Sequence, residues 1–142
     1  MTLYSCTQQA PILPSNQSPL GALPARFRRE RLLIVGYGDV GQRVARLLAT
    51  ATGVQRRVRI MVLNRELSRT QALRAQSVQP LLGDLDQADS LKRLAGIASR
   101  VLHLAPPAVL AQSDGPNDPR TTALLRALRL RKLPRSLVYA ST

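Results

Sequence analysis

Residues 32–41 read Leu-Leu-Ile-Val-Gly-Tyr-Gly-Asp-Val-Gly, and this stretch decides the fold. Leu32–Val35 is a short, wholly apolar run of the kind that forms a buried parallel strand. After the glycines, apolar residues recur at helical spacing as far as Thr50. A Gly-x-Gly-x-x-Gly turn between a strand and a helix predicts a binding site for the phosphates of a dinucleotide, which would lie against backbone amides at the positive end of the helix.

The three glycines have different expected roles. Gly36 permits the tight turn, Gly38 lets the backbone approach a pyrophosphate, and Gly41 lets the helix pack closely on the strand. The alternative is a glycine turn without a ligand. The candidate cofactor-binding residues of this motif are Gly36, Tyr37, Gly38, Asp39, Val40 and Gly41.

The rest of the chain alternates between strand and helix patterns, which predicts parallel strands joined by helical crossovers. The expected architecture is α/β, a doubly wound (Rossmann) sheet of about five strands in the order 3-2-1-4-5. Pro80 suggests that the third strand is short. Further strands are expected at 58–63, 78–82, 100–105 and 136–140. Helices are expected at 40–50, at 68–76 behind a Ser68–Gln71 capping box, up to Gly96 behind Asp86 or Asp89, and at 119–131 behind Asp118.

The end of the second strand usually selects the dinucleotide, because an acidic residue there binds the ribose 2′-hydroxyl of NAD. Asn64 holds that place and Arg65 follows it. An arginine can pair with the 2′-phosphate of NADP, so the sequence favours NADP. Glu66 keeps NAD possible, and Arg65 could equally be one more surface arginine.

Polar residues after the third strand and small residues after the fourth are also site candidates. Asp84, followed by Leu85, could accept the adenine amine or cap a helix, while Asp86 is the better candidate for a cap. Leu104, Ala105 and Pro106 close the fourth strand near the switch point, where ligands bind in such sheets. His103 has no partner at metal spacing and is expected to be packed or hydrogen-bonded, and no metal site is expected.

Composition limits the remaining classes. The chain has 142 residues, 21 basic and 8 acidic, with a net charge of +13. The basic residues are spread along the chain and only four aromatic residues accompany them, so dispersed surface arginines explain the charge and a nucleic-acid partner is not expected. Cys6 is the lone cysteine, which excludes an internal disulfide. The absence of a long apolar run argues against a membrane segment. We expect a cytoplasmic protein with a flexible, proline-rich tail at 1–28 and one domain at 29–142.

Four motifs together resemble the short-chain dehydrogenase/reductase superfamily, most closely its extended or atypical branch of NAD(P)-dependent epimerase/dehydratase-like proteins. They are the turn Gly36–Gly41, the Gly83-Asp84-Leu85 step, the strand Val101–Ala105 and the ending Leu137–Thr142. The resemblance implies that Thr142, or alternatively Ser141, stands where the family's catalytic Ser/Thr bonds the substrate.

The family mechanism also needs a Tyr-x-x-x-Lys pair, with the tyrosine as general acid/base, and this pair does not occur here. The sequence therefore predicts the N-terminal Rossmann portion of an oxidoreductase, truncated or incomplete at its C-terminal end, that binds cofactor without turnover. Exposed surface left by missing elements predicts self-association. The alternatives are a regulatory nucleotide-sensing domain like those of potassium transporters and a basic nucleic-acid-binding protein.

Overall fold

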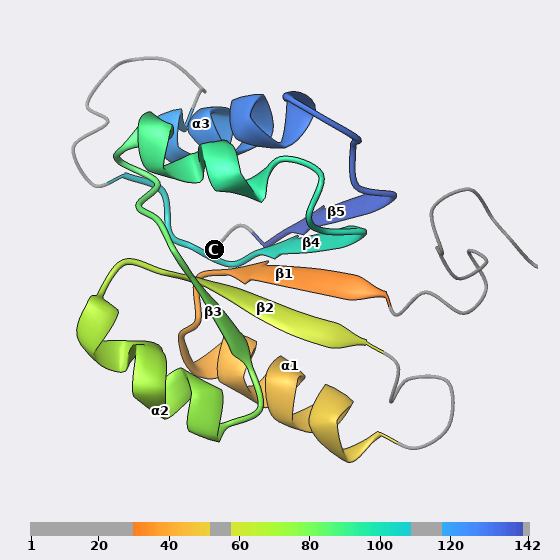
Figure 1. Ribbon diagram of the computed structural model, residues 1–142. Helices are drawn as coiled ribbons and strands as arrows, with labels where there is room; N and C mark the ends of the chain where they lie inside the picture. Colours follow the sequence, from red (N-terminus) through yellow and green to blue (C-terminus); the bar gives the residue numbers. More distant parts are fainter. Residues whose placement is uncertain (1–29, 52–57, 109–117, 141–142) are drawn as a thin grey trace, which may run out of the picture.

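The computed structural model describes residues 30–51, 58–108 and 118–140, and these form a parallel sheet with helices on both faces (Figure 1). The strand order β3-β2-β1-β4-β5 is the expected one. Ile34 at the centre pairs with Val62 on one side and Leu102 on the other. The strands are β1 Arg31–Val35, β2 Arg59–Asn64, β3 Gln79–Leu82, β4 Arg100–His103 and β5 Ser136–Tyr139.

Helical segments cover the two faces of the sheet in pairs. α1 and α2 lie on one face, and η4 and α3 lie on the other (Figure 1). The segments are α1 Asp39–Thr50, the 3₁₀ turn η3 Leu67–Arg69, α2 Thr70–Ala75, the 3₁₀ helix η4 Ala88–Leu94 and α3 Pro119–Arg129.

Alternation along the strands divides the buried side chains into two cores. Leu33 and Val35 of β1 face η4 and α3, whereas Ile34 faces α1 and α2. All three are fully buried, as expected for a central strand covered on both faces. The core beneath η4 and α3 also contains Met61, Leu63, Leu91, Leu94, Val101, Leu124 and Leu128. The core beneath α1 and α2 contains Ala45, Ile60, Val62, Leu73 and Val78.

Two expected helix caps are wrong. Helical structure after β2 already begins at Leu67, so Ser68 lies inside a 3₁₀ turn and no side chain caps this segment or α2. The segment after β3 is a 3₁₀ helix with Gln87 at its N-cap, so neither Asp86 nor Asp89 caps it. The turn after β2 is instead closed by the Asn64 side chain, and the turn after β3 by the Asp84 side chain.

The remaining boundaries need smaller corrections. β4 ends at His103, α3 at Arg129 and β5 at Tyr139, each one or two residues before the expected end. The predicted cap at Asp118 is confirmed, because its carboxylate accepts hydrogen bonds from the amides of Arg120 and Thr121. β3 is a four-residue edge strand that contains Pro80, which fits the predicted short strand. None of the helices in the described ranges has the length and apolar character needed to cross a bilayer.

Candidate functional site

The glycine turn lies at the carboxyl edge of the sheet, between β1 and α1. Gly36 has a φ of +93°, which disfavours any residue with a side chain. A Cβ there would lie 2.4 Å from the amide nitrogen of Ala105 and 2.6 Å from the carbonyl carbon of Leu104. The turn therefore packs closely against the segment that follows β4. The candidate residues of the glycine turn and those at Leu104–Pro106 thus lie next to each other.

Gly38 and Gly41 differ in what surrounds them. A Cβ on Gly41 would come within 2.8 Å of the Gly36 carbonyl oxygen, so this glycine allows the close packing of α1. A Cβ on Gly38 would meet nothing within 4 Å. Gly38 is also the N-cap of α1 and offers no side-chain cap, although the first amides of a helix lack intrahelical acceptors. Open space thus coincides with a helix N-terminus that no side chain of the described residues caps.

Tyr37 packs against the core beneath α1 and α2. Its hydroxyl donates a hydrogen bond of 3.0 Å to Oε1 of Gln76, which follows α2. Burial raises the pKa of the Tyr37 phenol, although the nearby Arg46 acts in the opposite direction. The role of Tyr37 here is to anchor the glycine turn to α2.

The three residues around the end of β2 have separate roles. The buried side chain of Asn64 closes the local turn, since its amide donates to the Glu66 carbonyl and its Oδ1 accepts from the Glu66 amide at 3.3 Å. The Glu66 carboxylate lies 3.6 Å from the guanidinium of Arg69. Arg65 is exposed, and its charge contributes to lowering the pKa of Asp86. Arg65 thus lies exposed at the carboxyl end of β2, directly after Asn64.

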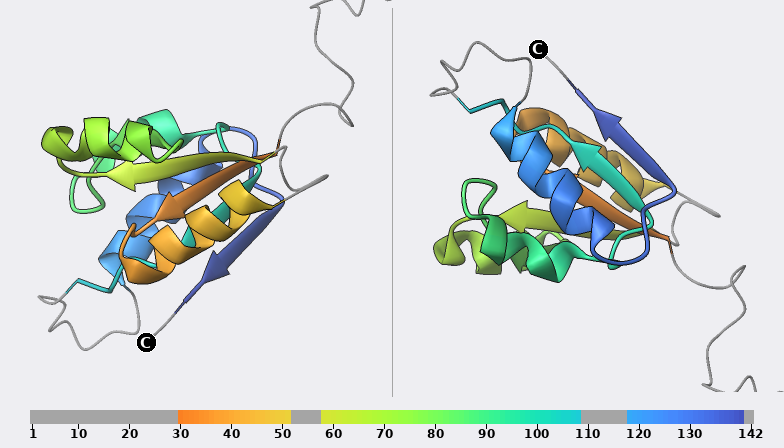
Figure 2. Two further views of the ribbon diagram at one scale, coloured as in Figure 1. Left: turned by 90° about the horizontal axis from the view of Figure 1, so that it is seen from below. Right: turned by 90° about the horizontal axis from the view of Figure 1, so that it is seen from above.

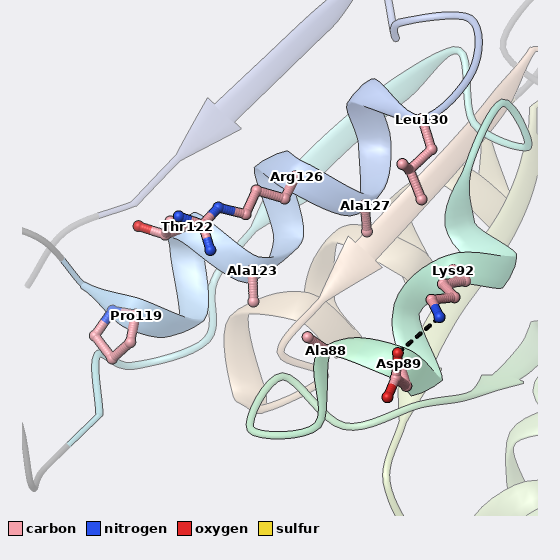
Figure 3. A pocket seen from close by; sticks show the side chains of 9 residues that line it. All are labelled: Ala88, Asp89, Lys92, Pro119, Thr122, Ala123, Arg126, Ala127 and Leu130. Atoms are coloured by element: carbon pink, nitrogen blue, oxygen red, sulfur yellow. Dashed lines mark ion pairs between the residues drawn. The ribbon is translucent and has the colours of Figure 1, made fainter.

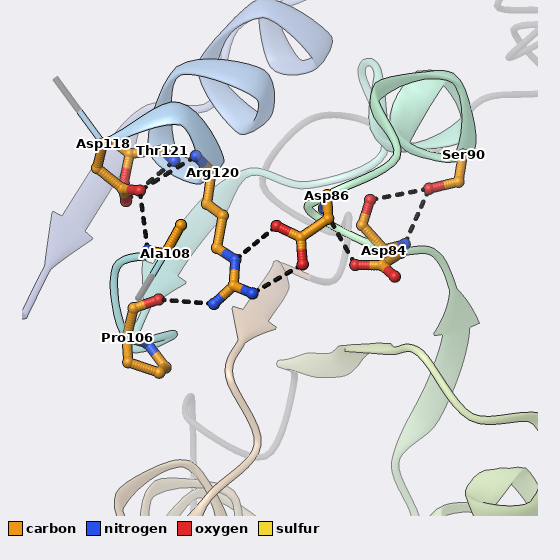
Figure 4. A network of polar contacts seen from close by, with 8 residues as sticks. All are labelled: Asp84, Asp86, Ser90, Pro106, Ala108, Asp118, Arg120 and Thr121. Atoms are coloured by element: carbon orange, nitrogen blue, oxygen red, sulfur yellow. Dashed lines mark hydrogen bonds and ion pairs between the residues drawn. The ribbon is translucent and has the colours of Figure 1, made fainter. Parts of the chain in front are cut away.

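Asp84 and Ser90 shape the turn after β3 (Figure 4). The Asp84 carboxylate accepts a hydrogen bond of 3.0 Å from the amide of Asp86. The Ser90 hydroxyl accepts from the Asp84 amide at 2.8 Å and contacts the Asp84 carbonyl oxygen at 3.0 Å. Leu85 packs against the core beneath η4 and α3. Asp84 thus closes the turn after β3, whereas the helix cap predicted at Asp86 does not form.

Asp86 instead pairs with Arg120, which is the second residue of α3. Nε and Nη2 of Arg120 donate to the two carboxylate oxygens of Asp86, each at 2.7 Å, and Nη1 donates to the carbonyl oxygen of Pro106 at 3.3 Å (Figure 4). These hydrogen bonds from Arg120 hold the pKa of Asp86 below its usual range. One arginine therefore joins the turn after β3 to the segment after β4, which the sequence did not indicate.

His103 is fully buried at the end of β4, as expected of a packed histidine. Its Nε2 lies 3.0 Å from the Thr121 hydroxyl, which donates a hydrogen bond of 2.6 Å to Asp118. The ring lies edge-to-face with Tyr139, with centroids 5.2 Å apart, and among the described residues Nδ1 has no hydrogen-bond partner. Burial lowers the pKa of His103, against opposing effects of the Asp118 charge and the Val35 carbonyl.

Other parts of the surface do not extend this site. An open groove of about 500 Å³ lies between η4 and α3, and no candidate cofactor residue lines it (Figure 3). Within the described ranges, no group of three or more His, Cys, Asp or Glu side chains could hold a metal ion. Ser141 and Thr142 lie outside the described residues. The structure therefore brings together the glycine turn, the residues after β2 and β3, and Leu104–Pro106.

The profile of one protein family, the saccharopine dehydrogenase NADP-binding domain, matches residues 32–113, which is more than half of the chain. The chain belongs to this family. It is an NADP-binding Rossmann domain of the dehydrogenase/reductase class, and the predicted preference for NADP is confirmed at this level. No curated protein matches the sequence.

Solved structures of dehydrogenases and other oxidoreductases share the fold of this NADP-binding domain. It matches apo saccharopine dehydrogenase (L-Glu forming) from Saccharomyces cerevisiae at 18% identity and a TM-score of 0.57, over 80% of this chain and 22% of that one. It matches the NADPH complex of quinone oxidoreductase QOR2 from Escherichia coli at 20% identity and a TM-score of 0.59, over 78% and 36%. A short-chain dehydrogenase/reductase superfamily protein from Agrobacterium tumefaciens with bound NAD matches at 25% identity and a TM-score of 0.56, over 80% and 33%. The chain thus spans about a fifth to just over a third of these proteins.

Proposed function

We propose that residues 29–142 bind NADP(H) at the glycine turn as the cofactor portion of an NAD(P)-dependent oxidoreductase of the epimerase/dehydratase-like branch. The observation that carries this proposal is the open space at Gly38 beside the uncapped N-terminus of α1. A pyrophosphate placed there would accept hydrogen bonds from the first amides of the helix and lie at the positive end of its dipole.

In this proposal, Arg65 binds the 2′-phosphate of NADP. Arg65 is exposed at the carboxyl end of β2, whereas the Asn64 side chain is occupied in its own turn and Glu66 lies against Arg69. An exposed guanidinium, next to a carboxylate that lies against Arg69, favours a phosphate over a bare 2′-hydroxyl. Asp84, Leu85, Leu104, Ala105 and Pro106 would form the wall beside the adenine and the centre of the cofactor.

The bound dinucleotide would supply hydride chemistry, and the residues of this chain would bind and orient it. Neither Tyr4 nor Tyr37 is followed four residues later by lysine. A catalytic role of Thr142 or Ser141 therefore has no general acid/base partner of the Tyr-x-x-x-Lys kind in this sequence. We propose that the chain by itself binds the cofactor without turnover.

The test is NADPH and NADH titration by calorimetry on the full chain. Replacing Gly38→Val should fill the open space and abolish binding of both cofactors while the circular dichroism spectrum is retained. Replacing Arg65→Gln should weaken NADPH by about tenfold or more, the usual range for a lost charged hydrogen bond, and leave NADH unchanged. Arg74→Gln, on the exposed side of α2, is the matched control. Unaltered NADPH affinity in Gly38→Val would reject this site.

A further inference from the structure

The amino edge of the sheet, opposite the glycine turn, carries a row of arginines. Arg59, Arg31 and Arg100 are the first residues of β2, β1 and β4, and Arg135 directly precedes β5. These four strands begin on the same side of the molecule, at the right of the view in Figure 1. We call these four residues the arginine row.

Backbone hydrogen bonds place the members of the row side by side. The Arg59 amide donates to the Glu30 carbonyl at 2.7 Å, next to Arg31, and Arg31 and Arg59 are register partners. The Ser99 amide donates to the Arg31 carbonyl at 2.9 Å, and the Arg135 amide donates to the Ser99 carbonyl at 2.7 Å. Since neighbouring strands lie about 4.8 Å apart, four strands span about 15 Å.

The positive charge of this edge is largely uncompensated in the part of the chain that the structure describes. All four arginines of the row are exposed, and so are Arg131 and Lys132 in the loop before β5. Arg100 pairs with Glu30 at 3.2 Å, which is the acidic residue found at this edge. The pleat directs Arg31 and Arg59 toward the η4 and α3 face and Arg100 toward the α1 face, so the charge extends around the edge.

We propose that the arginine row binds the phosphate backbone of a nucleic acid, independently of sequence. Basic residues that are dispersed along the chain are gathered by the sheet into one band, which is the electrostatic footprint of such a surface. Guanidinium groups suit phosphate oxygens because they can donate two parallel hydrogen bonds. None of the described residues of this band is aromatic, so bases would not stack on it and sequence would not be read.

A nucleic acid fits these observations better than a protein partner. Protein interfaces contain a central group of buried aromatic or apolar anchors, whereas the row itself consists of charged side chains alone. A phosphodiester chain supplies continuous negative charge and needs no such centre. The surface lies at the edge opposite the proposed cofactor site, so the two ligands would bind at the same time.

The test measures binding of a labelled single-stranded RNA of about 20 nucleotides by fluorescence anisotropy. The full chain is compared with the quadruple variant Arg31→Gln, Arg59→Gln, Arg100→Gln and Arg135→Gln. Its control is the variant Arg43→Gln, Arg46→Gln, Arg69→Gln and Arg74→Gln, which removes the same charge from exposed positions on α1, η3 and α2. At moderate salt, the row variant should lose about tenfold or more in affinity. Its salt-dependence slope should fall by up to about 3, at about 0.7 per lost contact. The control should change by about twofold or less.

Three results would overturn the proposal. One is an equal loss of affinity in the control, because binding would then follow net charge alone. Another is competition between saturating NADPH and the RNA. The third concerns poly-glutamate and vesicles rich in anionic lipid. If either binds as tightly as the RNA and loses as much affinity in the row variant, the surface would be assigned to a protein or membrane partner. Circular dichroism verifies folding. If the quadruple variant is unfolded, the single variants Arg59→Gln and Arg135→Gln replace it, each with an expected loss of about twofold to threefold.

Discussion

At the scale of single residues, two glycines two positions apart have opposite constraints. Gly36 is fixed by its positive φ and by the backbone of Ala105, whereas Gly38 has an ordinary φ of −80° and open space where a side chain would be. Gly36 therefore serves the fold and Gly38 is free to serve a ligand. Stability and binding measurements can separate the two roles.

Replacing Gly36→Ala should destabilise the protein by about 3 kcal/mol or more, because a Cβ would be both strained and too close to backbone atoms. The measurement is chemical denaturation followed by circular dichroism. Gly38→Ala is the control and should cost about 1 kcal/mol or less, the effect of a weaker N-cap. Equal losses in both variants would contradict the distinction.

His103 makes stability depend on pH, since it is the single histidine of the chain. Its pKa is lowered in the folded state by burial, below the value of about 6.5 in an unfolded chain. The unfolded chain then takes up a proton that the folded chain does not, so stability is complete above about pH 6.5 and falls as the pH drops through that value toward the folded pKa.

The melting temperature should therefore decline between pH 7 and pH 5 in the unaltered protein. In His103→Phe, which has no titrating ring, this decline should be absent although the variant is less stable overall. The carboxylates with lowered pKa, Asp86, Asp89 and Asp118, affect stability only at lower pH, below about 4. Differential scanning calorimetry across this range checks the prediction, and an undiminished decline in the variant would refute it.

At the scale of elements, Arg120 connects three segments that surround the proposed cofactor site. It lies in the first turn of α3, pairs with Asp86 after β3, and donates to the carbonyl of Pro106 after β4. Its side chain is 22% exposed, against 47% for Asp86, so the pair is screened by solvent on one side. We expect this pair to order the site rather than to stabilise the whole fold.

Arg120→Gln and Asp86→Asn should each weaken NADPH by about threefold to tenfold, with little change in melting temperature, because each frees the turn after β3. The NADPH affinity of the double variant should be no lower than that of the single variant that binds less tightly, since partners in one pair act non-additively. Calorimetric titration measures all three. Lys92→Gln, which breaks the exposed pair with Asp89 on η4, is the control and should bind normally. Additive losses would mean that the two residues act separately.

The elements that could be predicted from sequence are those that local patterns determine. An apolar run ending at glycine marks β1, and Asp118 followed by Pro119 marks the start of α3. The predicted Ser68–Gln71 capping box does not form, because the Asn64 side chain bonds to the backbone of Glu66 and the helical turn already begins at Leu67. Contacts such as Asp86–Arg120 could not be predicted, because their partners are 34 residues apart and meet only through the strand order.

At the scale of the whole molecule, β5 is an exposed edge of the sheet. Seen from below in Figure 2, α1 and α2 cover the inner strands, and no described helix crosses in front of β5. Val138 is 57% exposed and pairs in register with Leu102, so the two share this uncovered face. An edge strand with apolar side chains is a template for pairing with another chain.

We therefore expect the protein to self-associate, and Val138→Lys to reduce this association, since a lysine on an edge strand opposes strand pairing. Light scattering over a concentration series is the measurement. Leu133→Lys is the control, because Leu133 is equally exposed but lies in the loop before β5. A monomeric unaltered protein at high concentration, or equal effects of the two variants, would contradict the assignment.

The exposed positive charge of this domain is unevenly distributed along the strand direction. The arginine row lies at the amino edge, where Arg100 pairs with Glu30. At the carboxyl side, Asp39, Glu66 and Asp86 each pair with an arginine of the same region. Among the described residues, the excess of positive charge is therefore concentrated at the amino edge. On a cation-exchange resin, the protein should adsorb in one orientation, amino edge down, with the glycine turn facing the buffer. Adsorbed protein would then keep its full capacity for dinucleotide, and the resin would act as an oriented affinity support.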